Sequence, residues 1–155
     1  MQDKATAEPA LIFPSFRGFY DRIIPLSWLV VRFGVGWNLS VHAYGKILRG
    51  MAGQAKLLEH DLPNLPSLTL PLAYLLTFVE GVGGLCIIVG LFTRFFAAAC
   101  ALELAFITFV LYWANGFSWL HRGYEYTLLW GFMCLAIALR GGGPYSLDRL
   151  IGKEL

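Results

Sequence analysis

An apolar run from Leu70 to Phe92 constrains the fold of this chain more than any other segment. The run is long enough to cross a bilayer as a helix, which takes about 20 residues. It contains one carboxylate, Glu80, followed by Gly83 and Gly84. A carboxylate inside a membrane is costly and marks a candidate functional site that needs a partner. The two glycines would let a neighbouring helix approach closely on the side of Glu80.

The overall composition agrees with a membrane protein. Of the 155 residues, 57% are hydrophobic and 14% are charged, whereas a soluble domain has roughly 25% charged residues. The formal net charge of +2 is too small to indicate nucleic-acid binding. Cys86, Cys100 and Cys134 all lie in apolar runs, and no two form a Cys-x-x-Cys pair, so the sequence does not favour dithiol redox chemistry.

The pattern of apolar runs predicts an all-α membrane protein, a bundle of four transmembrane helices within residues 25–150. The expected spans cover about residues 25–48, 70–92, 95–115 and 124–139. Residues 1–10 are expected to be a disordered tail and 151–155 a short tail. Residues 11–24 show helical apolar spacing between charges, which predicts a separate amphipathic helix at the membrane interface. A short helix is expected over residues 53–60, and a tight turn at Thr93-Arg94.

The distribution of basic residues predicts the orientation. One side of the bundle would hold Lys4, Arg17, Arg22, Arg94, Arg140, Arg149 and Lys153. The other side would hold Lys46, Arg49, Lys56 and Arg122. Because cytoplasmic loops are enriched in Lys and Arg, the sequence predicts a multi-pass protein of the bacterial inner (cytoplasmic) membrane with both termini in the cytoplasm.

Three predicted spans each contribute a charge at a similar estimated depth. These are Arg32, Glu80 and Glu103. A lone charge at that depth costs about 2.5–3.5 kcal/mol, and an arginine can serve two carboxylates. We therefore expect Arg32 to pair with Glu80, Glu103 or both. Such a pairing would either fix the helix register or form part of a site for a membrane-soluble ligand.

A second polar layer is expected near the outer boundary, with His42 and Lys46 at the end of the first span and Glu125 at the start of the fourth. Together with Arg32 and Glu80, these residues are our candidates for binding a quinone headgroup. A quinone requires an apolar groove with a few hydrogen-bond partners. The alternative is that they are interfacial residues in contact with water. No His–His or His–carboxylate spacing on one helix predicts a metal site.

Several short motifs occur in a recognisable order. They are Arg32, His42-Ala-Tyr-Gly-Lys46, Glu80-Gly-Val-Gly-Gly-Leu, Gly90-Leu-Phe-Thr-Arg94, Gly123-Tyr-Glu125 and Gly141-Gly-Gly-Pro-Tyr-Ser-Leu-Asp148. This order resembles the DoxX family of small bacterial membrane proteins over about residues 27–150. The resemblance implies four transmembrane helices and a link to quinone or thiol redox chemistry, because relatives include the DoxD-like subunit of a thiosulfate:quinone oxidoreductase. Glu103 is not part of the family pattern, and a glycine often follows the histidine directly in the family.

The sequence contains no recognisable electron carrier: no Cys-x-x-Cys, iron–sulfur spacing, dinucleotide fingerprint or paired haem histidines. We therefore expect a quinone-interacting or accessory subunit of a membrane oxidoreductase, in contact with lipid and other membrane subunits or with copies of itself. Whether the chain is itself an enzyme stays open at this point. The alternative is a non-catalytic structural or assembly subunit. A third hypothesis is a small transporter, but four helices leave little room for alternating access without oligomerisation.

Overall fold

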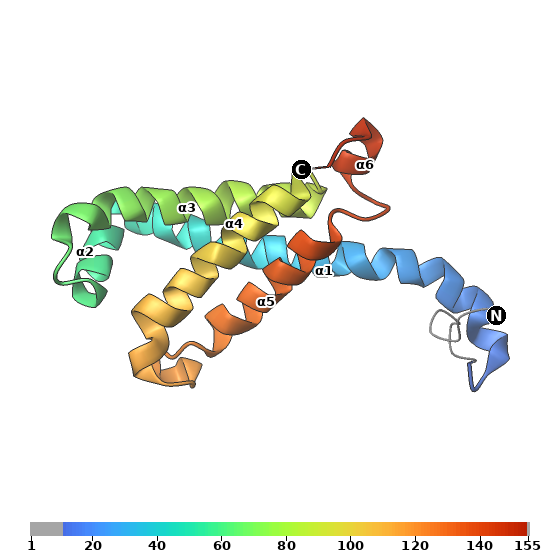
Figure 1. The fold of residues 1–155 in the computed structure, drawn as a ribbon, viewed down its shortest axis with the longest axis horizontal. Helices are drawn as coiled ribbons and strands as arrows, with labels where there is room; N and C mark the ends of the chain where they lie inside the picture. The colour runs from blue at the N-terminus through green and yellow to red at the C-terminus, as the bar shows by residue number, and fades with distance from the viewer. Residues whose placement is uncertain (1–10, 155) are drawn as a thin grey trace, which may run out of the picture.

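The computed structural model describes residues 11–154, which form helices and no strand. Four long helices make up the body of the protein (Figure 1): α1 (Arg17–Arg49), α3 (Pro66–Val89), α4 (Thr93–Phe106) and α5 (Glu125–Arg140). The shorter helices are α2 (Met51–Asp61) and α6 (Leu147–Ile151). The disordered tail predicted for residues 1–10 lies outside the described residues.

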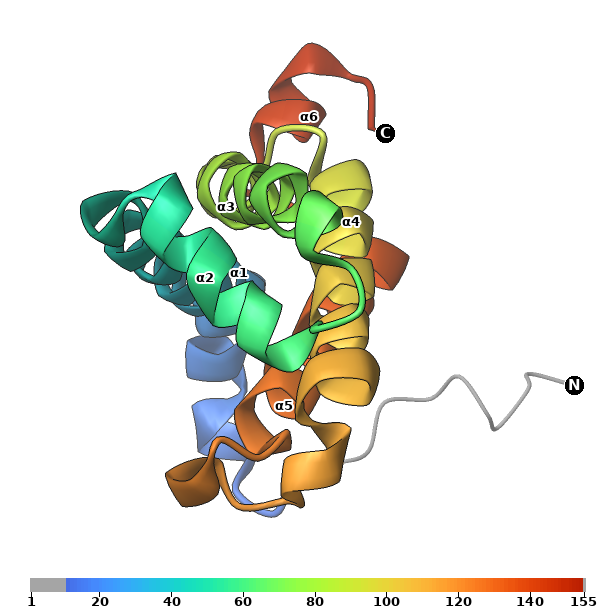
Figure 2. The same ribbon diagram turned by 90° about the vertical axis from the view of Figure 1, so that its left-hand side faces the viewer.

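Three of the helical segments are long and apolar enough to cross a membrane: Pro14–Arg49, Pro66–Val89 and Thr93–Asn115. The third continues α4 through a π-helical stretch, Ile107–Tyr112, and a 3-10 turn, Trp113–Asn115. These three segments confirm the first three predicted spans as membrane-length helices. The fourth predicted segment is also helical. It forms α5, which has 16 residues and packs along α4. Figure 2, which views the end at which α2 lies, shows α3 between α1 and α4.

The N-terminal part of α1 differs from the prediction. A separate amphipathic helix was expected over residues 11–24, but this was wrong. A 3-10 turn at Pro14–Phe16 leads directly into α1, which continues through Pro25 without a break. A proline removes one backbone hydrogen bond from a helix interior, and the helical residues on both sides of Pro25 maintain the helix across this loss.

The turn between α3 and α4 also lies earlier than predicted. Gly90 ends α3 with a left-handed φ of 73°, Phe92 has a φ of 46°, and Thr93 already begins α4. A non-glycine residue with positive φ is uncommon. Here Asp148 holds the turn, because its carboxylate accepts hydrogen bonds from Phe92 N at 2.7 Å, Thr93 N at 2.9 Å and Thr93 Oγ1 at 2.6 Å. The tight turn predicted at Thr93-Arg94 was therefore misplaced.

Residues 141–151, which we call the C-terminal clasp, fold back over the same end of the bundle. Besides the contacts of Asp148, the Trp28 side-chain Nε1 donates to the carbonyl of Gly141 at 2.8 Å, and Arg32 Nη2 donates to the carbonyl of Tyr145. The clasp therefore connects α1 to the turn between α3 and α4.

Glycines set the crossing of α1 and α3. A Cβ added to Gly84 would lie 2.7 Å from the carbonyl oxygen of Gly36 and 3.0 Å from the backbone nitrogen of Ser40. On α3, a Cβ at the neighbouring Gly83 would lie 2.8 Å from Cys100 Sγ on α4. The predicted glycine face is thus confirmed, and it packs against helices of this same chain.

Candidate functional site

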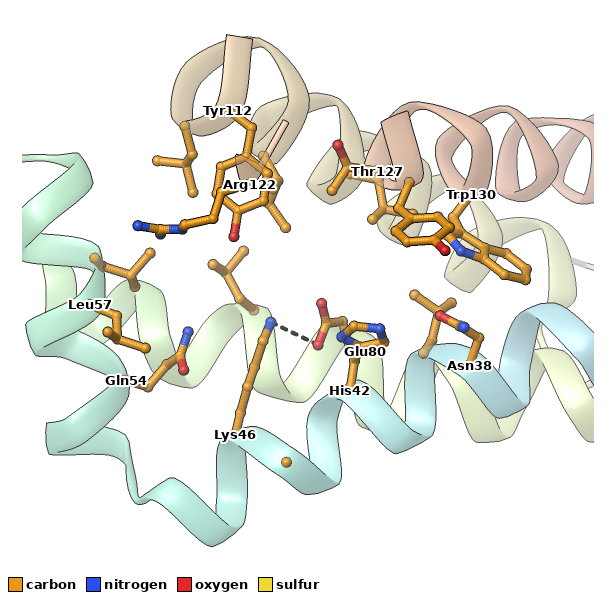
Figure 3. A pocket seen from close by; sticks show the side chains of 18 of the residues that line it. Asn38, His42, Lys46, Gln54, Leu57, Glu80, Tyr112, Arg122, Thr127 and Trp130 are labelled. Atoms are coloured by element: carbon orange, nitrogen blue, oxygen red, sulfur yellow. Dashed lines mark ion pairs between the residues drawn. The ribbon is translucent and has the colours of Figure 1, made fainter. Parts of the chain in front are cut away.

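A pocket of about 670 Å³ lies between α1, α2, α3, α5 and the π-helical continuation of α4 (Figure 3). This volume is in the usual range for small-molecule sites, about 300–1,000 Å³. Leucines from α1, α2, α3 and the α4 segment supply much of the apolar wall. Polar side chains in the lining include Asn38, His42, Lys46, Gln54, Glu80 and Tyr126.

One face of α1 supplies three of these polar residues. Asn38, His42 and Lys46 are spaced four residues apart, and residues with this spacing lie on the same side of a helix. Glu80 reaches the pocket from α3 because the close contact of Gly36 with Gly84 brings the two helices together. The polar face of α1 and Glu80 of α3 therefore meet in the same pocket.

Lys46, Glu80 and Glu103 form a buried charge cluster, which we call the acid–lysine cluster. Lys46 Nζ lies 2.7 Å from Glu80 Oε2, the contact drawn as a dashed line in Figure 3, and 3.8 Å from Glu103 Oε1. Glu80 and Glu103 are 4% and 6% exposed. Lys46 and Glu80 line the pocket, whereas Glu103 lies behind them on α4.

Arg32 is not part of this cluster, so the predicted pairing of Arg32 with Glu80 or Glu103 is wrong. Because α1 and α3 run in opposite directions and cross at Gly36 and Gly84, Glu80 lies level with the part of α1 that follows Gly36. Arg32 lies on the other side of that crossing. It is fully buried beside the C-terminal clasp, where it donates to the carbonyl of Tyr145.

Glu125 is also absent from the pocket lining. It sits in the first turn of α5, and its Oε2 accepts a hydrogen bond from the backbone of Trp119 at 3.3 Å. Glu125 therefore stabilises the loop before α5. Of the five candidate ligand-binding residues, the structure brings together His42, Lys46 and Glu80 and separates Arg32 and Glu125 from them.

The rim of the pocket is made by residues that the sequence did not single out. Arg49 donates to Gln54 Oε1 at 2.7 Å, which joins the end of α1 to α2. Arg122, in the loop before α5, lies 3.1 Å from Asp61 at the end of α2, and its guanidinium lies over the Tyr112 ring at 5.7 Å. Burial lowers the pKa of Arg122, but Asp61 and Tyr112 together outweigh that effect, so the pKa is raised above its ordinary value.

A signal for this rim exists in the sequence. Gln54, Leu58 and Asp61 are spaced as i, i+4 and i+7, so they share one face of the short connector helix. All three line the pocket. The prolines of the connector predict a loop with only a short helix, and polar residues are ordinary in such a segment.

Comparison with known proteins agrees with the motif order. Residues 27–113 match the family model described as DoxX. The chain is also 39% identical over 114 residues to "Inner membrane protein YqjF" of Escherichia coli (strain K12), which covers 72% of this chain and 81% of that protein. No solved structure gives a significant match. Three membrane-length apolar helices and this relative identify a multi-pass protein of the inner membrane. From the span of the family match and the identity to this relative, the chain belongs to the DoxX family.

Proposed function

We propose that the pocket binds a quinone headgroup and that the protein is a quinone-interacting or accessory subunit of a membrane oxidoreductase complex. The observation that carries this proposal is the pocket itself, which combines an apolar wall with hydrogen-bond donors inside a group of membrane-length helices. The resemblance to the DoxX family supports it, because relatives include a DoxD-like subunit of a thiosulfate:quinone oxidoreductase.

The lining matches the two parts of a quinone. The leucine-rich wall would contact the ring and the first part of an isoprenoid tail. His42, Lys46 and Tyr126 carry N–H or O–H donors for the carbonyl oxygens. The sequence supplies no Cys-x-x-Cys pair or other recognisable electron carrier. In this proposal a partner subunit therefore delivers or receives the electrons, and this chain binds and positions the quinone.

The binding test uses protein in lipid nanodiscs titrated with a short-chain ubiquinone and a short-chain menaquinone. Trp130 lines the pocket, so tryptophan fluorescence reports on occupancy. We expect saturable quenching with at least one of the two quinones. His42→Ala and Tyr126→Phe should each weaken binding roughly tenfold, because losing one hydrogen bond worth about 1.4 kcal/mol changes affinity by that factor.

His121→Ala is the matched control, because His121 is exposed and lies outside the pocket lining. This variant should bind quinone as the wild type does. Quenching that never saturates, or an equal loss of affinity in His121→Ala and His42→Ala, would refute the proposed quinone site.

The contacts of two glycines bear on the alternative of a purely structural subunit. Such a subunit would pack its glycine-rich second span and its aromatic outer halves against helices of a larger complex. Gly83 and Gly84 instead contact α4 and α1 of the same chain. The alternative predicts that a co-purifying partner keeps its full activity when Lys46 and Glu80 are both neutralised, whereas a quinone-binding subunit predicts that this activity falls.

We also infer that α5 is a fourth membrane span and that both termini face the cytoplasm. The 16 residues of α5 extend about 24 Å at 1.5 Å per residue, close to the hydrocarbon thickness of about 30 Å. Figure 1 shows the start of α1 and the end of α5 toward the same end of the molecule. A green fluorescent protein fused to the C-terminus should fluoresce, and alkaline phosphatase fused there should be inactive. The opposite pair of results would overturn the inferred orientation.

A further inference from the structure

The acid–lysine cluster contains more negative than positive charge. Lys46 Nζ lies 2.7 Å from Glu80 and 3.8 Å from Glu103, so one ammonium serves two carboxyl groups. The side chains of the two acids are only 5% and 3% exposed. Both oxygens of Glu103 are buried and accept no hydrogen bond from the described residues. With both acids ionised, the cluster would have one negative charge without a partner.

Such a charge is unfavourable in this place. A buried carboxylate without a compensating charge or hydrogen-bond donor costs far more than its neutral form. When two carboxylates share one site, one of them tends to keep its proton. Glu80 Oε2 and Glu103 Oε1 both lie near the same atom, Lys46 Nζ, so the two carboxyl groups are neighbours, and a protonated carboxyl group is a donor. A proton on Glu103 would therefore remove the excess charge and supply the missing hydrogen bond.

In the described part of the chain, the two acids share a single ion-pair partner. The titratable side chains that lie around the two acids come from all four long helices: His42, Lys46, Glu80, Cys100, Tyr126 and Cys134. Within residues 11–154, Lys46 is the sole basic side chain at ion-pairing distance from either acid. The charge balance of the cluster therefore depends on a proton.

We propose that Glu80 and Glu103 form a proton-binding site that retains one proton at neutral pH, with Lys46 balancing the remaining carboxylate. Lys46 and Glu80 line the pocket, so the proton exchanges with the solution through it. A pocket ligand thus meets a carboxyl pair that can give or accept a proton. This proposal goes beyond quinone binding, because the charge count holds whether or not a ligand is present.

Infrared spectroscopy of the protein in lipid nanodiscs tests the proton directly. At neutral pH the wild type should show the C=O band of a protonated carboxyl group, and this band should shift when H₂O is exchanged for D₂O. Glu103→Gln and Glu80→Gln should each abolish the band, because Lys46 then balances the single remaining carboxylate. Glu125→Gln is the control and should keep the band, since Glu125 lies outside the cluster.

Lys46→Met provides an independent check that keeps both acids. Without the ammonium, both carboxyl groups should be protonated, and the band should grow roughly twofold. This variant and the wild-type spectrum decide the question even where a glutamine variant does not fold. A wild-type spectrum without the band, a band that survives in both glutamine variants, or a band that appears only when sodium is removed would overturn the proposal. The last result would indicate a cation site.

The outcome is separable from the quinone proposal. Quinone titration of the same nanodisc samples reports on the ligand, and the infrared band reports on the proton. A band without saturable quinone binding would support the proton site and refute the quinone site. Quinone binding without a band would support the quinone site and refute the proton site.

Discussion

The two ends of the bundle use buried charge in opposite ways. At the C-terminal clasp, Asp148 accepts three hydrogen bonds from the turn between α3 and α4. Arg32 donates there to a backbone carbonyl, although its Nε and Nη1 find no acceptor among the described residues. At the pocket, Lys46 is shared by Glu80 and Glu103, and no residue within 11–154 donates a hydrogen bond to Glu103. The carboxylate at the clasp holds a backbone turn through its hydrogen bonds, whereas the carboxyl groups at the pocket have hydrogen-bonding capacity left for a ligand or a proton.

For the buried acids, this difference indicates which one is structural and which one is a candidate for function. Buried polar groups in proteins are nearly always hydrogen-bonded, so an exception calls for an explanation. Asp148 is satisfied by partners in its own chain and needs no ligand. The carboxyl group of Glu103 is unsatisfied and lies beside a pocket, which makes the acid–lysine cluster the part of the molecule where ligand or proton exchange is expected.

The largest effect on stability should come from Asp148→Ala. Hydrogen bonds to a charged group are worth about 1.5–3 kcal/mol each, so losing the contacts to Phe92 and Thr93 should lower the free energy of unfolding by about 3 kcal/mol. Reversible unfolding in mixed detergent micelles measures this change. Asp21→Ala, at an exposed position of α1, is the control and should have little effect. An equal loss in both variants would contradict the structural role of the clasp.

A smaller loss of stability is expected for Gly84→Ala, which lies where α1 and α3 cross, between the two ends of the bundle. The new Cβ would meet the backbone of Gly36 at 2.7 Å and that of Ser40 at 3.0 Å. Backbone atoms cannot move aside as a side chain can, so we expect a loss of about 2 kcal/mol from overpacking. Gly34→Ala has open space around its Cβ and should not destabilise the protein in the same unfolding assay. If both alanines were tolerated equally, α1 and α3 would not be in backbone contact.

Trp28→Phe should have a more modest effect on the clasp. The substitution removes the Nε1 donor that bonds the carbonyl of Gly141 at 2.8 Å, while an aromatic ring remains beneath Arg140. One such hydrogen bond contributes about 1 kcal/mol. Trp37→Phe is the matched control, because Trp37 is exposed and stacks on Phe33. A thermal unfolding midpoint that falls only for Trp28→Phe would confirm the contribution of the clasp.

The smallest effect on stability is expected for Glu103→Gln. The amide is neutral, like the protonated acid that we propose, so the free energy of unfolding should change by less than about 0.5 kcal/mol. The same acid-to-amide change at the clasp, Asp148→Asn, should cost more, because Asp148 accepts three hydrogen bonds. Unfolding of the two variants side by side makes the comparison. If Glu103→Gln lowered the free energy of unfolding as much as Asp148→Asn does, the two ends of the bundle would not differ in how they use buried charge.

Much of the fold can be predicted from the sequence because the helices are defined locally. Each membrane-length run is apolar over more than about 20 residues, and glycines or prolines separate the runs. The apolar run at residues 70–92 predicts the second span, although the helix itself begins at Pro66 and ends before Gly90. The continuous passage of α1 through Pro25 was not predictable in this way, because a proline can either begin a helix or sit within one.

The composition of the site was harder to predict, because it depends on where helices cross. Counting residues from an assumed membrane boundary placed Arg32 level with Glu80. The contact of Gly36 with Gly84 sets a different register, in which Lys46 is the partner of Glu80. The structure does bring His42, Lys46 and Glu80 together. The sequence singles these residues out because polar residues in apolar helices are costly and stand out. The polar residues of α2 did not stand out, since polar residues are ordinary in a connector.

The position of Asp148 has a consequence for the order in which the protein is completed during synthesis. Chains fold from the N-terminus as they leave the ribosome, so α3 and α4 emerge long before the residue that holds the turn between them. Until Asp148 has been added, 56 residues after Phe92, no carboxylate from this position can hold Phe92 in its left-handed conformation. The α3–α4 hairpin is therefore expected to stay loosely joined until the C-terminal clasp has folded back over it.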